Sequence, residues 1–105
     1  MTRQGELRGY DPDLLDYIFW AAQVRGLSPN TTRVRLDFLH RLHQFAGVSL
    51  REIEPHILLK FERVAIAGKA AETRSAYTSH LRAFFRWAAK TGIVSVDPTE
   101  VLTMP

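Results

Sequence analysis

The chain has 105 residues, of which 46% are apolar and 24% charged, as in a single soluble globular domain and unlike a collagenous or disordered chain. It has no cysteine, which excludes disulfide bonds and thiolate metal sites. Its longest strongly apolar run, "YIFWAA" at 17–22, is too short to span a bilayer. We therefore expect a cytoplasmic protein without membrane contacts.

Positive charge is unevenly distributed along the chain. The formal net charge is +3 at pH 7, but residues 69–90 hold five basic residues against one acidic residue, Glu72. That segment carries +4 and the remainder −1. A local surplus of this kind is typical of binding to a polyanion, although an exposed Arg-rich helix would show it too.

The first predicted helix runs from Asp11-Pro12 to Gly26, and the second runs from Ser28-Pro29 to Gly47. In each, a capping residue and a proline give the start, and a glycine gives the end. Apolar residues at helical spacing predict the buried faces: Leu14, Leu15, Ile18, Phe19 and Ala22 in the first helix, and Val34, Phe38, Leu39, Leu42 and Phe45 in the second.

Ser49 is predicted to cap a short turn through "LREIE". A third helix runs from near Pro55 to Gly68, a fourth from 70–73 to Gly92, and a last short helix starts at Asp97-Pro98. Since no segment alternates, we predict an all-α, compact bundle of four main helices plus a short C-terminal helix. The predicted core residues of the last two main helices are Ile57, Leu58, Phe61 and Val64, and Tyr77, Leu81, Phe84, Phe85 and Ala88.

The fourth helix separates an apolar face from a basic one. At about 100° per residue, its core residues lie opposite a line of hydroxyls and cations: Ser75, Ser79, Arg82, Arg86 and Lys90. Such side chains bind phosphate oxygens. A flank with small residues lies between the two faces and would allow close approach to a groove or to another helix: Ala76, His80, Ala83 and Trp87.

The second helix has a weaker version of this pattern. Arg33 and Arg41 share a face with Asp37 and Gln44, and Thr31 lies in the first turn. This face is a secondary candidate for ligand contact.

Other functional sites are not supported. His40 and His43 have an i, i+3 spacing but no third ligand nearby, so we interpret them as surface histidines and expect no metal or cofactor. The chain has no glycine-rich phosphate loop and no arrangement that defines a catalytic triad. Capping and the helix dipole explain the carboxylates near helix starts: Asp11, Asp13, Glu52, Glu54 and Asp97. We expect no enzymatic activity from this chain by itself.

Several motifs in order resemble the N-terminal core-binding, SAM-like domain of tyrosine recombinases and phage integrases. These are a "SPNT" helix start at 28–31, Glu52-Ile53 before the third helix, Thr73 leading a helix with "LRAFF" at 81–85, Gly92-Ile93, and Asp97-Pro98. The resemblance covers about residues 12–103. One departure is Arg35, where family members often have tyrosine.

The resemblance implies a domain that forms half of a C-shaped clamp on duplex DNA, with the second and fourth helices facing the DNA. It also implies a separate domain that cleaves DNA with an arginine, a His-x-x-Arg motif and a tyrosine nucleophile. No His-x-x-Arg occurs in this sequence, and Tyr10, Tyr17 and Tyr77 are interpreted as packing or surface residues. The expected division is a flexible segment at 1–10, the DNA-binding domain at 11–103 and the start of an interdomain linker at 104–105.

The expected partners are double-stranded DNA and other recombinase protomers, with no small-molecule substrate. The candidate DNA contacts, mainly to phosphates and with His80 as a candidate for a base edge, are Thr31, Arg33, Lys69, Thr73, Arg74, Ser75, Ser79, His80, Arg82, Arg86 and Lys90. The alternative is a helical module for protein–protein interaction or self-association, which an exposed Tyr17 or Trp20 on the first helix would favour.

Overall fold

The structure is a computed structural model that describes residues 9–102. The segments predicted at 1–10 and 104–105 therefore lie outside the described residues, apart from Gly9 and Tyr10. Tyr10 is half-buried and stacks on His40, with ring centroids 4.1 Å apart. The predicted DNA-binding domain at 11–103 is described up to Leu102.

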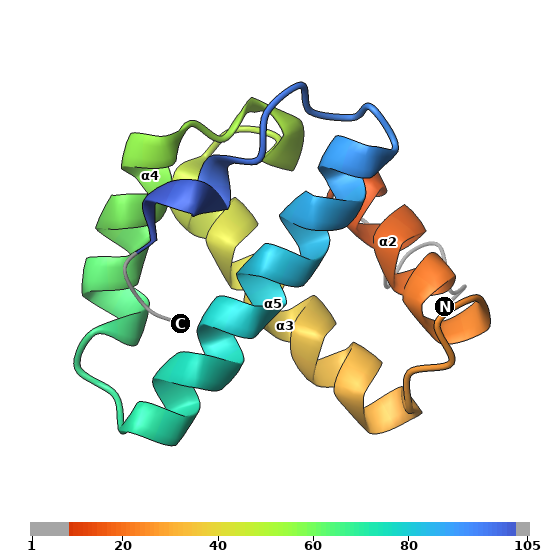
Figure 1. Cartoon of the computed structure of the whole chain (residues 1–105), viewed down its shortest axis with the longest axis horizontal. Coiled ribbons are helices and arrows are strands. Elements are labelled where there is room, and N and C mark those ends of the chain that lie inside the picture. The colour runs from red at the N-terminus through yellow and green to blue at the C-terminus, as the bar shows by residue number, and fades with distance from the viewer. Residues whose placement is uncertain (1–8, 103–105) are drawn as a thin grey trace.

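The described residues form helices and turns, without a strand, which confirms the all-α prediction. The main helices are α2 (Pro12–Gln23), α3 (Pro29–Ala46), α4 (Pro55–Phe61) and α5 (Ala71–Lys90). A 3₁₀ turn η1 (Leu50–Glu52) precedes α4, a π-helical segment η2 (Glu62–Ile66) continues it, and a 3₁₀ helix η3 (Pro98–Val101) comes last. In Figure 1, α5 crosses in front of α3, with α2 on one side of the crossing and α4 on the other.

The helix boundaries follow the sequence signals closely. The Asp11 side chain caps α2 by accepting from the Asp13 backbone N–H at 2.8 Å, and Ser28 caps α3 by accepting from the Thr31 N–H at 3.1 Å. Gly47 ends α3 at φ 71°, a left-handed conformation that glycine adopts without steric cost. The predicted starts and stops of these two helices are therefore confirmed within a few residues.

The core is aromatic where α2 meets α5. Tyr17, Phe84 and Phe85 are buried, and Tyr17 contacts Phe84 edge-on with ring centroids 5.5 Å apart. Trp20 and Trp87 pack beside this pair, so both tryptophans act as packing residues. Aliphatic residues from every main helix complete the interior: Leu14, Leu39, Leu42, Leu58, Ile66 and Leu81.

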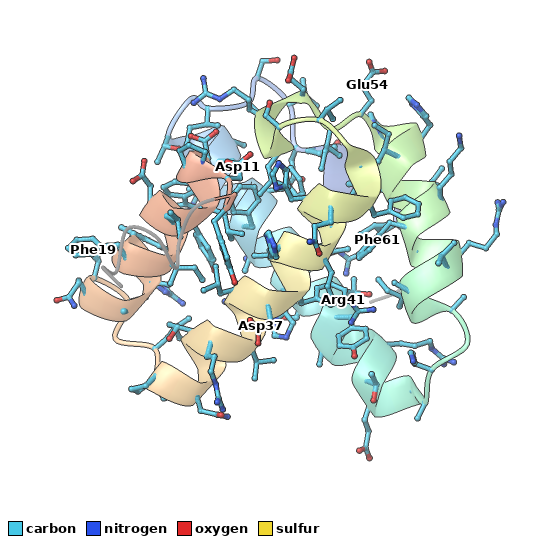
Figure 2. All side chains as sticks on the ribbon, turned by 180° about the vertical axis from the view of Figure 1, so that it is seen from behind. Asp11, Phe19, Asp37, Arg41, Glu54 and Phe61 are labelled. Atoms are coloured by element: carbon cyan, nitrogen blue, oxygen red, sulfur yellow. The ribbon has the colours of Figure 1, made fainter. Side chains whose placement is uncertain are left out.

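The rotation of α2 differs from the predicted one. Phe19 was expected in the core, but it is 69% exposed and points outward from the helix (Figure 2), whereas Tyr17 is 1% exposed. Leu15, Ile18 and Ala22 are only half-buried. The predicted face was wrong because α2 is apolar on nearly every side, which leaves its periodicity without a clear phase. Because Tyr17 is buried, it cannot provide the exposed surface that would favour self-association through the first helix.

The end of the third predicted helix also differs. After Phe61 the backbone widens into the π-helical η2, which has more residues per turn than an α-helix. Val64 is consequently turned outward and is 72% exposed, while Ala65 and Ile66 face the core. A prediction based on α-helical spacing placed Val64 inside, and the π turn explains the error.

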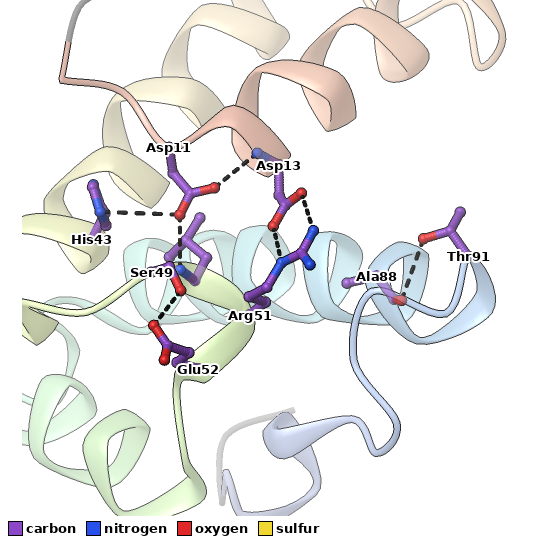
Figure 3. A network of polar contacts seen from close by, with 9 residues as sticks. Asp11, Asp13, His43, Ser49, Arg51, Glu52, Ala88 and Thr91 are labelled. Atoms are coloured by element: carbon purple, nitrogen blue, oxygen red, sulfur yellow. Dashed lines mark hydrogen bonds and ion pairs between the residues drawn. The ribbon is translucent and has the colours of Figure 1, made fainter.

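A polar network fixes the start of α2 to the turn η1 (Figure 3). The buried Asp11 carboxylate also accepts from the Leu50 backbone N–H at 2.8 Å. Asp13 accepts two hydrogen bonds from Arg51, each 2.9 Å long, and this contact raises the pKa of Arg51. Ser49 donates to Glu52 at 2.6 Å instead of capping η1. Asp11 and Asp13 thus hold a tertiary contact in addition to their predicted role at the helix start.

Among the described residues, none of the helices combines the length and apolar character needed to cross a membrane. The same residues contain no group of three or more His, Cys, Asp or Glu side chains arranged to hold a metal ion.

Candidate nucleic-acid interface

The outer face of α5 carries four of the eleven predicted contacts. Ser75, Ser79, Arg86 and Lys90 are exposed, as their position opposite the buried Leu81, Phe84 and Ala88 requires. We call these four residues the α5 stripe. The helix α5 itself crosses in front of α3 in Figure 1.

Arg82 has different surroundings from the stripe. Its side chain is half-buried and its Nη2 donates to the Leu102 carbonyl oxygen at 3.3 Å. Arg82 therefore fastens the end of the described chain to the middle of α5. The sequence placed it in one line with Arg86 and Lys90, but its guanidinium is partly used within the protein.

The N-terminal end of α5 holds three further candidates. Lys69 is exposed, Thr73 and Arg74 are half-buried, and Arg74 Nη1 donates to the Lys69 carbonyl oxygen at 3.1 Å. The N-cap residue Ala70 has no side chain that could cap the helix. The first backbone N–H groups of α5 therefore stay free of side-chain caps, next to the cations Lys69 and Arg74 and one carboxylate, Glu72.

The start of α3 is already engaged in local contacts. Ser28 donates to the Thr31 hydroxyl at 3.0 Å, and Arg33 Nη2 donates to Asn30 Oδ1 at 2.8 Å. Arg33 lies one turn before Asp37 and shares its face. Asp37 and Arg41 lie on the side of α3 seen from behind in Figure 2, away from α5. The structure therefore does not bring Arg33 together with the α5 stripe.

His80 is not on the surface. It is 8% exposed, and its Nδ1 accepts from Arg35 Nε at 3.1 Å. Burial, and secondly the charge of Arg35, lower the pKa of His80 to about 4. The predicted base-edge contact therefore does not fit this structure, because a buried imidazole that already accepts a hydrogen bond cannot reach a base.

The other residues of the flank that includes His80 differ from one another in burial. Ala76 is exposed and Ala83 is half-buried, whereas Trp87 packs against Tyr17 and Phe84. His40 and His43, predicted as surface histidines, are half-buried, with His43 Nε2 4.0 Å from Asp11 Oδ2.

A groove of about 580 Å³ opens between α2, α3 and the C-terminal half of α5. We call it the α2–α3–α5 groove. Four cations line it, and two of them, Arg25 and Arg35, were not among the predicted contacts. The remaining lining residues are Tyr17, Trp20, Leu27, Ser79, Ala83, Arg86, Trp87, Lys90 and Thr91, and none of the lining residues is acidic.

The cations of this region lack carboxylate partners within residues 9–102. Among these residues, Arg51 with Asp13 is the single ion pair between an arginine or lysine and a carboxylate. The positive charge of Arg25, Arg35, Arg86 and Lys90 is therefore not neutralised by the described part of the protein. Arg25 follows α2 and Arg35 lies on α3, so counting charges along α5 could not find them.

The fold matches that of a solved phage protein. The integrase from mycobacterium phage Brujita superposes with a TM-score of 0.83, over 94% of this chain and 34% of that chain, at 21% sequence identity. That similarity defines the class of protein: an all-α domain with the fold of an integrase domain.

The sequence relationship is more specific. The tyrosine recombinase XerC of Bifidobacterium longum (strain DJO10A) is 32% identical over 100 residues, which cover 91% of this chain and 28% of that protein. No family model matches the sequence. The chain is related to the tyrosine recombinase and integrase family, and it spans about a third or less of the length of both relatives.

Proposed function

We propose that this chain is the DNA-binding, core-binding domain of a site-specific tyrosine recombinase, which holds duplex DNA at the recombination site through α3 and α5. The observation that carries the proposal is the basic surface formed by the α5 stripe and the α2–α3–α5 groove, whose cations have no carboxylate partners among residues 9–102. The relationship to a tyrosine recombinase supplies the ligand class.

The structure supports a change in how α3 takes part. Arg33 lies on a face directed away from α5, while Arg35 lines the groove together with Arg86 and Lys90. We therefore propose that α3 contributes through Arg35 and the half-buried Thr31 rather than through Arg33. In this proposal the domain binds and positions DNA, and the covalent chemistry of recombination belongs to residues outside this sequence, which contains no His-x-x-Arg motif.

Titration into a fluorescently labelled duplex of arbitrary sequence tests the proposal. We expect weak binding at 50 mM salt that falls steeply as salt rises, because each phosphate contact releases counterions and adds about 0.9 to the slope of log K against log salt. A protein of similar size and net charge without a basic groove is the control. Absence of binding at low salt, or binding that is indifferent to salt, would refute the function.

A second candidate function is self-association through the outer face of α2. The specific observation is that Phe19, on the side of α2 opposite the buried Leu14, Tyr17 and Ala21, is 69% exposed. This surface replaces the Tyr17 surface expected from the sequence, since Tyr17 is buried. Contact between protomers on DNA would be compatible with the first function.

A further inference from the structure

Arg35 is held in place by two uncharged acceptors. Its Nε donates to His80 Nδ1 at 3.1 Å, and its Nη1 donates to the Tyr17 hydroxyl at 2.9 Å. Tyr17 is 1% exposed and His80 8% exposed, so both acceptors are themselves fixed by the core. Because arginine cannot accept a hydrogen bond, His80 must present an unprotonated Nδ1.

This arrangement fixes the guanidinium without neutralising it. A buried arginine is ordinarily paired with a carboxylate, but neither partner of Arg35 is a carboxylate, and the lowered pKa keeps His80 uncharged near pH 7. Of its five N–H donors, two are used, and three remain without an acceptor among residues 9–102. The half-buried side chain lines the α2–α3–α5 groove, so these donors and the full positive charge are available to a ligand.

The surroundings of Arg35 indicate what kind of ligand that is. Arg25, Arg86 and Lys90 line the same groove, and their mutual repulsion is unfavourable until an anion enters. Trp20 and Trp87, with ring centroids 6.4 Å apart, add aromatic surface to it. Ser79, Arg86 and Lys90 belong both to the groove and to the α5 stripe, so the groove is continuous with the surface proposed to follow the DNA.

We propose that the α2–α3–α5 groove binds a backbone phosphate of duplex DNA, with Arg35 as its fixed ligand and Arg86 and Lys90 at its rim. Tyr17 and His80 are positioning residues that hold the guanidinium fork toward the groove. A planar fork fixed in advance loses little entropy when it binds a phosphate. This inference rests on the proposed function, because it assigns one phosphate of the DNA to one place on the protein.

The test compares duplex affinity of the wild-type protein with that of Arg35→Met and Arg63→Met. Arg63 is an exposed arginine on η2, on the α4 side of the helix crossing, so its replacement is matched in charge and side chain. We expect Arg35→Met to lose about tenfold in affinity and to lower the salt slope by about 1, with Arg63→Met within about twofold of wild type. Arg35→Lys keeps the charge without the fork and should lose about threefold.

The two proposals fail in different ways. If the wild-type protein does not bind duplex DNA, the proposed function falls. If it binds, and Arg35→Met matches Arg63→Met, the phosphate site falls and the function stands. A poly-glutamate peptide that competes at the same concentration as the duplex would assign the groove to an acidic protein segment and overturn the DNA assignment.

A measurement on the wild-type protein covers the case in which Arg35→Met does not fold. In ¹⁵N-labelled protein, the Arg35 Nε–H resonance should shift when the duplex is added, and the Arg51 Nε–H resonance, held by Asp13, should not. An unmoved Arg35 signal in DNA-saturated protein would overturn the proposal. Tyr17→Phe, which keeps the ring but frees Nη1, should lower affinity about two- to threefold with an unchanged salt slope, since the charge remains.

Discussion

Arg82 and Arg86 lie one turn apart on α5, and the structure gives them different tasks. Arg82 donates to the Leu102 carbonyl oxygen, while Arg86 is exposed and lines the groove. We predict that Arg86→Ala weakens duplex binding about fivefold and leaves the free energy of unfolding within about 0.5 kcal/mol of wild type. Arg82→Ala should instead lower that free energy by about 1 kcal/mol, the worth of one hydrogen bond.

Denaturant unfolding and DNA titration of the same two variants check this division. Equal losses of DNA affinity in both variants, with unchanged stability, would show that the two arginines form one line of phosphate contacts, as the sequence alone suggested.

His80 gives a pH prediction. Its folded-state pKa of about 4 lies below the ordinary value of 6.5, so between those values the unfolded chain binds more protons than the folded one. Stability from this group is complete above pH 6.5 and is lost as the pH falls toward 4, by an amount on the order of 2 kcal/mol. Protonation would also remove the acceptor for Arg35 Nε.

The check is urea unfolding at several pH values between 7 and 4 for wild type and His80→Gln. Carboxylates titrate in both proteins, so the difference between the two curves isolates His80. The groups that face His80 are Arg35 and the ring of Phe38, both on α3, and no described carboxylate forms an ion pair or hydrogen bond with it. Parallel curves for the two proteins would contradict the assignment.

The surroundings of these residues could be predicted only in part. The helical period placed Arg86 and Lys90 outside correctly, because they lie opposite a well-defined apolar stripe. It could not place His80, whose burial depends on Arg35, 45 residues earlier in the chain. A pattern read within one helix contains no information about that contact.

At the scale of single elements, the start of α2 is the most informative. Asp11 caps the helix and also accepts from the Leu50 N–H of η1, both in a buried position. We predict that Asp11→Ala destabilises the protein by about 2–4 kcal/mol, since it removes a cap and leaves the buried Leu50 N–H unpaired. Thermal unfolding followed by circular dichroism measures the loss.

Asp97→Ala is the matched control. Asp97 caps η3 through the Thr99 N–H at 2.9 Å but makes no tertiary hydrogen bond of the Asp11 kind within residues 9–102, so its loss should cost about 1 kcal/mol. Equal losses for the two variants would mean that the Asp11–Leu50 hydrogen bond contributes nothing beyond capping.

Helix boundaries were predictable and helix rotations were less so. Caps at Ser28 and Gly47 are local signals that depend on a few neighbouring residues, and they gave the ends of α3. The buried face of α2 was wrong because its sequence is apolar around most of its circumference. In η2, which packs against α5, the π turn exposes Val64, and α-helical spacing in the sequence could not indicate it.

For the whole molecule, the fold class and its four main helices were predictable, but the α2–α3–α5 groove was not. Its walls come from three helices, and its cations Arg25, Arg35 and Arg86 are up to 61 residues apart in the sequence. Charge counting along the chain detects a concentration such as 69–90. It misses cations that only tertiary structure brings together.

The exposed Phe19 leads to a prediction about association. If the outer face of α2 joins copies of the chain, the wild-type protein should show a mass that rises with concentration in light scattering, and Phe19→Ser should remain monomeric. Because Phe19 is 69% exposed, this change should leave thermal stability nearly unchanged. A wild-type protein that stays monomeric at the highest accessible concentration would rule out this second function.

The groove is built from three helices, and this has a consequence for the stability of the DNA-bound protein. A phosphate bound there would contact Arg35 of α3 and Arg86 and Lys90 of α5 at the same time, and separating those helices would require releasing it first. DNA binding would then stabilise the folded domain. At a duplex concentration of 100 times Kd, mass action adds about 2.7 kcal/mol to the free energy of unfolding. The bound DNA would thus stabilise the packing of the same helices that bind it.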